Sequence, residues 1–133
     1  MSKTPDDWKN EGNKALQTHN YDESIRCYSE AIKAAKQDSD SLKWKVHIYY
    51  SNRSAAHAHK KEFLQAVEDA EECCKEAQLR NQKFAKGYSR MGAAYYGLGR
   101  YAQAEAAYKD GLKIDSNNAA LLRKNCRNNG TSL

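Results

Sequence analysis

The chain has 133 residues, of which 40% are hydrophobic, 29% charged and 10% aromatic, with one Pro and seven Gly. These values exclude a collagen-like chain and a disordered one, and the length suits a single domain. The 22 Lys and Arg against 17 Asp and Glu give a net charge of +5, which favours an anionic partner without identifying it.

Hydropathy and cysteine spacing further limit the class of protein to which this chain can belong. The longest charge-free stretch, Met91 to Gly99, is far shorter than the roughly 20 apolar residues of a bilayer span, and the polar start does not resemble a secretion signal. The four cysteines show no CxxC spacing and no His at zinc-ligand spacing; they are Cys27, Cys73, Cys74 and Cys126. We expect reduced thiols in a cytoplasmic protein, with no metal and no cofactor.

Helical periodicity runs through nearly the whole chain. Apolar and small residues recur every three or four positions and nowhere alternate long enough for a strand, which predicts an all-α fold. Thr4, followed by Pro and two acidic residues, predicts the start of a helix over about 6–18. Asn20 predicts the cap of a second helix over about 21–36, and a turn around Gly99 separates two later helices.

Three segments share one spacing of large, small and aromatic residues. The small positions, where two helices can approach closely, are Gly12, Ser24, Ser54, Ala66, Gly92 and Ala104. This pattern resembles the tetratricopeptide repeat, a helix-turn-helix unit of about 34 residues. The resemblance implies one domain over 1–133, with repeats at about 5–38, 47–80 and 85–118, stacked in a right-handed superhelix. An amphipathic run then predicts a capping helix at about 117–128.

The spacing departs from the family in its connections. The repeat starts lie 42 and 38 residues apart, so that about eight and four residues are inserted. The Pro that usually ends the second helix of the repeat is replaced by Lys36, Gln78 and Ser116. Without this helix breaker, the helices on either side of the first insertion can be longer and project past the bundle. The polar stretches 37–40 and 78–82 are expected to be exposed connections.

Five polar residues fall on the helices that would line the concave groove of such a superhelix. Lys9 and Asn13, like Lys86 and Arg90, are four positions apart and share a helix face, and Asn52 lies on the helix between these pairs. In the segments Tyr-Ser-Asn-Arg-Ser-Ala-Ala at 50–56 and Lys-Gly-Tyr-Ser-Arg at 86–90, they resemble the two-carboxylate clamp of Hop-type co-chaperones. The resemblance implies that these five residues hold the C-terminal Glu-Glu-Val-Asp tail of the seventy- and ninety-kilodalton heat-shock chaperones.

The residue types suit that ligand. A C-terminal Asp carries two carboxylates, and Lys, Arg and Asn supply point charges, a forked donor face and uncharged amide donors. We expect roughly micromolar affinity, because ordering a flexible peptide offsets much of the gain. The resemblance further implies an apolar pocket for the penultimate Val at Leu16, Ala55 and Ala58. His59 stands where related domains often have a Lys that contacts an upstream Glu.

Two other function classes stay open. The first is a general scaffold that binds an internal helical or extended segment of another protein and uses the same residues as a basic lining. The second is nucleic-acid binding, which the interspersed acidic residues disfavour. No enzyme signature is found, and the tyrosines are explained by packing. We therefore predict a non-enzymatic, monomeric adaptor that contacts neither nucleic acid nor membrane, either complete or the first domain of a longer co-chaperone.

Overall fold

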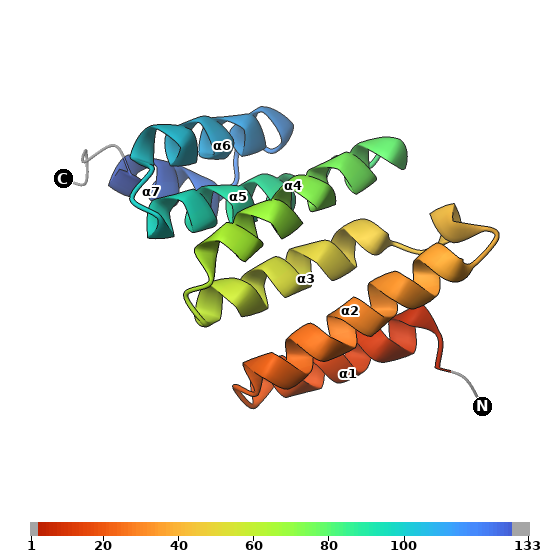
Figure 1. Cartoon of the computed structure of the whole chain (residues 1–133). Coiled ribbons are helices and arrows are strands. Elements are labelled where there is room, and N and C mark those ends of the chain that lie inside the picture. Colours follow the sequence, from red (N-terminus) through yellow and green to blue (C-terminus); the bar gives the residue numbers. More distant parts are fainter. Residues whose placement is uncertain (1–2, 129–133) are drawn as a thin grey trace.

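The computed structural model describes residues 3–128, which form helices without any strand (Figure 1). The α-helices are α1 (Pro5–Gln17), α2 (Tyr21–Gln37), α3 (Val46–His59), α4 (Phe63–Leu79), α5 (Ala85–Gly97), α6 (Tyr101–Ile114) and α7 (Ala119–Asn128), and the short 3-10 helix η1 (Ser41–Lys43) precedes α3. The hairpins α1–α2, α3–α4 and α5–α6 stack in chain order, and α7 follows them. The predicted all-α class is confirmed.

The first two helices start where their caps were predicted. The Thr4 hydroxyl accepts a hydrogen bond from the Asp7 amide at 3.1 Å, and the Asp7 carboxylate accepts one from the Thr4 amide at 2.9 Å. The bond from the Thr4 amide lowers the pKa of Asp7, because it stabilises the ionised carboxylate. The Asn20 side chain accepts a hydrogen bond from the Glu23 amide at 3.4 Å. Local capping chemistry thus sets the start of the first hairpin.

The three hairpin turns share one backbone conformation. A single residue with positive φ lies between the two helices of each hairpin: His19 at 62°, Lys61 at 62° and Gly99 at 76°. A repeated left-handed residue at the same place shows that the three hairpins are copies of one supersecondary unit.

Small residues let the two helices of a hairpin approach closely. A Cβ atom on Gly12 would lie 2.6 Å from Cε1 of Tyr28, and one on Gly92 would overlap the ring of Tyr108. In the second hairpin the corresponding residue is Ser54, whose hydroxyl donates to the carbonyl of Ala66 at 2.7 Å. The small residues predicted from the repeat pattern therefore serve packing.

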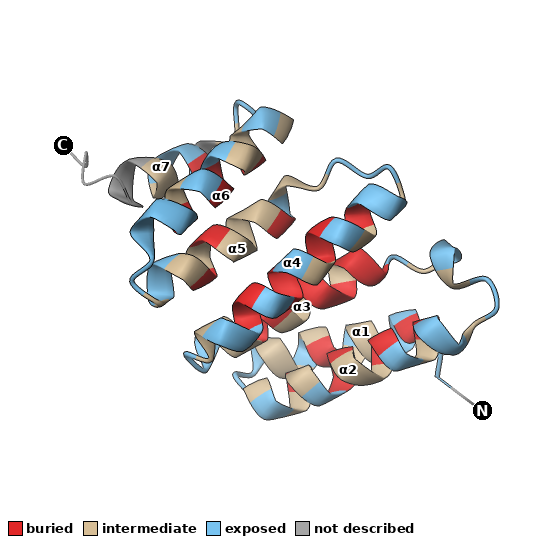
Figure 2. Ribbon diagram, turned by 45° about the horizontal axis from the view of Figure 1, so that its top comes forward, coloured by how far each residue is buried: buried red, intermediate tan, exposed pale blue. Residues whose placement is uncertain are grey.

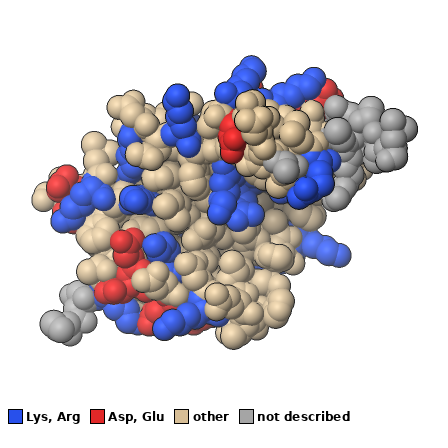
Figure 3. All heavy atoms as spheres, turned by 180° about the vertical axis from the view of Figure 1, so that it is seen from behind, with Lys and Arg blue, Asp and Glu red and all other residues tan. Residues whose placement is uncertain are grey.

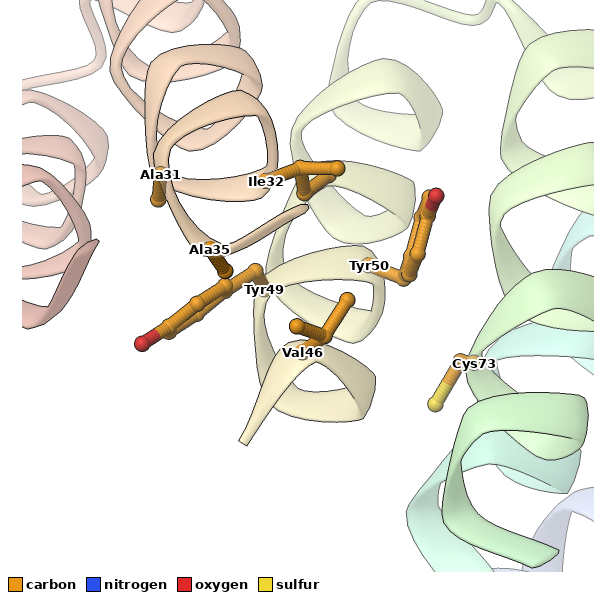
Figure 4. Close-up of a cluster of buried hydrophobic side chains, with 7 residues drawn as sticks. All are labelled: Ala31, Ile32, Ala35, Val46, Tyr49, Tyr50 and Cys73. Carbon is orange, nitrogen blue, oxygen red and sulfur yellow. The ribbon is translucent and has the colours of Figure 1, made fainter. Parts of the chain in front are cut away.

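The hydrophobic core is divided among the helix layers instead of forming one centre. Buried residues lie on the facing sides of neighbouring helices (Figure 2). The cluster between α2, α3 and α4 is drawn in Figure 4 and contains Ala31, Ile32, Ala35, Val46, Tyr49, Tyr50 and Cys73. At the other end, Leu121 of α7 is 1% exposed against Ala104 and Tyr108, so α7 covers the last hairpin. The side chain of Cys126 lies outside the described residues.

The first insertion adopts a different structure from the one predicted. The helix before it, α2, is long at 17 residues, but α3 has 14 residues, close to the 13 of α1, so the predicted lengthening of α3 is wrong. Residues 38–45 bend back instead, because Trp44 packs against the first core cluster and donates its indole N–H to Asp38 at 2.8 Å. Among the described residues, no helix combines the length and apolarity that a bilayer crossing requires.

Candidate functional site

The five predicted binding residues come from the first helices of the three hairpins. Lys9 and Asn13 lie on α1, Asn52 on α3, and Lys86 and Arg90 on α5. Residue contacts join α1 to α3 and α3 to α5, so these helices line one side of the stack. Figure 3 shows the molecule from behind, where Lys and Arg side chains spread across the middle and acidic side chains gather near the N-terminal end.

Two of the five residues are in direct contact. The Asn52 amide nitrogen donates to Oδ1 of Asn13 at 3.2 Å, and the Tyr28 hydroxyl donates to the same oxygen at 2.5 Å. Because both donors meet the oxygen, the orientation of the Asn13 amide is fixed and its Nδ2 remains a donor. The chain thus holds one amide donor in place before any ligand arrives.

Arg90 lies on α5 and has no anionic partner among the residues that the structure describes. Its Nε atom is buried without a hydrogen-bond partner, and Arg90 forms no ion pair with any residue from 3 to 128 that the structure describes. Burial lowers the pKa of this guanidinium, while the neighbouring Cys73 and Tyr28 act in the opposite direction. Burial also raises the pKa of Tyr28 to about 12, so the Tyr28 hydroxyl stays protonated at neutral pH.

The two lysines lie one helical turn away from these residues. Nζ of Lys9 is 3.9 Å from Oδ1 of Asp6, an oxygen that also accepts a hydrogen bond from the Tyr49 hydroxyl at 2.5 Å. Lys86 is exposed in the first turn of α5 and forms no ion pair within the described part of the chain. The structure thus brings Asn13 and Asn52 into direct contact, whereas Lys9 lies within ion-pair distance of Asp6 and Lys86 is exposed.

The four residues predicted to make secondary contacts with the peptide differ in burial and in packing partners. Leu16 is half-buried on α1 and Ala55 is 8% exposed on α3. Ala58 packs against the core cluster of Ala66, Val67 and Ala94. His59 is exposed and stacks on Tyr21, with ring centroids 4.9 Å apart and planes 2° from parallel. Ala58 and His59 therefore already have packing partners within the fold.

An ion pair next to Asn52 was not anticipated from the sequence. Arg53 donates two hydrogen bonds to Asp69 at 2.8 and 2.7 Å and a third to the Ser29 hydroxyl at 3.0 Å. Asp69 is 5% exposed, so this pair is largely shielded from solvent. These hydrogen bonds join α3 to α4 and α2. They hold α3, and with it Asn52, in one orientation. An acidic residue at a core position of α4 was the available signal, since buried carboxylates are normally paired.

Known proteins share this architecture. The model of the family described as tetratricopeptide repeat matches residues 85–118. Heat shock protein STI1 of Saccharomyces cerevisiae is 39% identical over 120 residues, which are 90% of this chain and 18% of that protein. Small glutamine-rich tetratricopeptide repeat-containing protein 2 of the same yeast is 40% identical over 114 residues, 86% of this chain and 30% of that protein. The chain thus spans less than a third of either curated relative.

Similarity extends to solved structures. The first TPR of Spaghetti (RPAP3), bound to the HSP90 peptide SRMEEVD, superposes with a TM-score of 0.82 at 25% sequence identity. The match covers 96% of this chain and 94% of that chain, so it extends over all three hairpins.

Proposed function

We propose that this chain, whose residues 85–118 match the tetratricopeptide-repeat family, is a co-chaperone adaptor module that binds the C-terminal Glu-Glu-Val-Asp tail of heat-shock chaperones. The relatives are named as heat-shock and organising proteins, and the matched solved structure holds a peptide that ends in these four residues. Such a module acts by binding and carries out no reaction of its own.

The observation that carries the proposal is the unpaired guanidinium of Arg90. A partly buried cation without an anion is unfavourable, and a ligand carboxylate that pairs with it removes that cost. The amide donors on Asn13 and Asn52 add hydrogen bonds without adding charge. This combination favours an anionic end group over a neutral one.

A C-terminal Asp fits these donors because it carries its side-chain carboxylate and its terminal carboxylate on one residue. Arg90 can present two parallel N–H groups to one carboxylate, and the Asn13 amide is held ready to donate. Lys9 and Lys86 reach in from α1 and α5 as mobile point charges. An internal Asp has only one carboxylate and would leave part of this donor set unused.

Isothermal titration calorimetry with a Glu-Glu-Val-Asp peptide tests the proposal. We expect a dissociation constant of roughly micromolar order, with weaker binding at higher salt because exposed charges are screened. The same peptide with an amidated C-terminus is the control, and it should fail to bind. Equal binding of the amidated peptide would eliminate the clamp and favour a scaffold for internal segments.

Two alanine variants with matched controls test the residue assignments. Lys86→Ala and Arg90→Ala should each weaken tail binding at least tenfold, because a hydrogen bond to a charged group contributes about 1.5–3 kcal/mol. The controls Lys83→Ala and Arg100→Ala remove exposed cations near these residues and should bind like the parent. Circular dichroism should be unchanged in all four. Parent-like binding by Arg90→Ala would refute the assignment.

A further inference from the structure

The first insertion is a fixed structural feature. The side chain of Arg80, at the end of α4, donates to the carbonyl of Trp44 at 2.9 Å and to that of Ser41 at 3.5 Å. It is itself held by Glu76 at 2.7 Å, and only 8% of the Arg80 side chain is exposed. The insertion is therefore bound to the second hairpin, and the surface that it forms exists before any partner binds.

A hollow of about 300 Å³ lies between this insertion and the end of α4. Its lining contains no acidic residue and combines basic and apolar side chains: Lys43, Lys45, His47, Arg80, Leu42 and Leu79. It shares no residue with the proposed tail-binding site. Its chemistry is that of a cationic rim around apolar side chains.

Two leucines give this hollow its apolar character. Leu79 is 64% exposed and Leu42 is 59% exposed, and these are the two most exposed large hydrophobic side chains in the described part of the chain. Single exposed leucines are ordinary, but two that line the same hollow provide a contact surface for another apolar group.

His47 adds a polar group that lacks a partner. It is 3% exposed, and its Nδ1 atom has no hydrogen-bond partner. Burial lowers the pKa of His47, and the nearby cations of Arg80 and Lys45 lower it further, whereas Glu76 acts in the opposite direction. An anionic group in the hollow would complement these cations.

We propose that this surface docks an internal acidic segment of a partner protein, one in which leucine-like side chains alternate with Asp or Glu. The apolar side chains would pack against Leu42 and Leu79. A carboxylate would pair with Lys45, and a second one would compete with Asp38, which lies 3.3 Å from the ammonium group of Lys43. These two lysines also line a neighbouring hollow of about 390 Å³ that contains Lys9. That second hollow also contains Asp6 and lies outside the proposed docking surface, which uses no residue of the tail site.

An end-blocked peptide can test this surface without engaging the tail site. The probe is Glu-Leu-Asp-Glu-Leu-Asp, acetylated at its N-terminus and amidated at its C-terminus, titrated into the 15N-labelled protein. We expect amide shifts confined to about residues 41–48 and 78–84, a dissociation constant on the order of 100 μM, and a higher pKa of His47 in the complex. Shifts confined to Asn13, Asn52 and Arg90, or no shifts at millimolar peptide, would overturn the proposal.

Matched variants separate the charged and apolar contributions. Lys45→Glu should weaken probe binding about fivefold, while Lys33→Glu, the same charge change on α2, should leave it unchanged. Leu79→Ser should weaken binding by a similar factor, and Leu64→Ser, an exposed leucine at the other end of α4, should not. Equal losses in a variant and its control would overturn the assignment.

Two other occupants can be recognised in the same experiment. Stronger binding of a ten-nucleotide poly-dT at the same amides would assign the surface to phosphate backbones and overturn the proposal. If the same amide shifts appeared on raising the protein concentration without the probe, the surface would be a contact between copies of this chain. That result would also overturn the proposal.

Discussion

Tyr28 shows how one side chain serves both the fold and the site. Its ring occupies the space that the missing side chain of Gly12 leaves between α1 and α2. Its hydroxyl donates to Asn13, so the ring position fixes where this hydrogen bond is made. Tyr108 covers Gly92 in the same way in the third hairpin.

Replacing Tyr28 by Phe separates these two roles. Tyr28→Phe keeps the ring but leaves the Asn13 amide held by Asn52 alone, and one lost hydrogen bond of about 1 kcal/mol predicts roughly fivefold weaker tail binding. Tyr108→Phe is the matched control and should bind as the parent does. Calorimetry measures both, with circular dichroism as a check on folding. Parent-like affinity of Tyr28→Phe would show that the amide needs no such support.

At the scale of elements, hairpin geometry depends on how closely two helices approach. The sequence predicted this from small residues at fixed spacing, because a side chain at such a position leaves no room for the opposite helix. It also predicted the first caps, since capping depends on residues three apart. The course of the first insertion was missed, because the hydrogen bonds from Arg80 to Ser41 and Trp44 join residues 36 or more positions apart.

The close approach predicts the effect of adding one methyl group. Gly92→Ala should destabilise the fold by about 1–3 kcal/mol, although Ala is the better helix former by about 1 kcal/mol, because the new Cβ overlaps Tyr108. Gly111→Ala should cost less, since its Cβ would lie 3.1 Å from Cδ1 of Leu121, a side chain able to move. Urea denaturation measures both variants. Equal stabilities would contradict this ranking.

At the scale of the whole molecule, the packed layers of helices bury several ionisable side chains, and burial keeps these side chains protonated. Burial raises the pKa of Cys73 to about 12 and that of Cys74 to about 11, from an ordinary value of 9.0. The pKa of Tyr28 is raised to about 12 for the same reason. Thiols with these values are poor nucleophiles at neutral pH, so they act as small core residues.

These shifts predict alkaline instability. Above pH 9 the unfolded chain loses thiol protons that the folded chain retains, so stability is fully present below pH 9 and falls as pH rises toward 11–12. At pH 10 each thiol should cost about 1 kcal/mol relative to pH 8. Urea midpoints at the two values measure the loss. Cys74→Ala should lose about 1 kcal/mol less, and an unchanged loss would show that Cys74 is not responsible.

The sequence alone determined the repeat architecture, because packing of adjacent helices depends on residue size at short, regular spacing. It also nominated Lys9, Asn13, Asn52, Lys86 and Arg90 through two short segments. Only the tertiary structure decided that Tyr28 orients Asn13, that Nε of Arg90 lies buried without a hydrogen-bond partner, and that Arg80 anchors the insertion. Each of these facts depends on the distance between residues from different helices, which local sequence patterns do not encode.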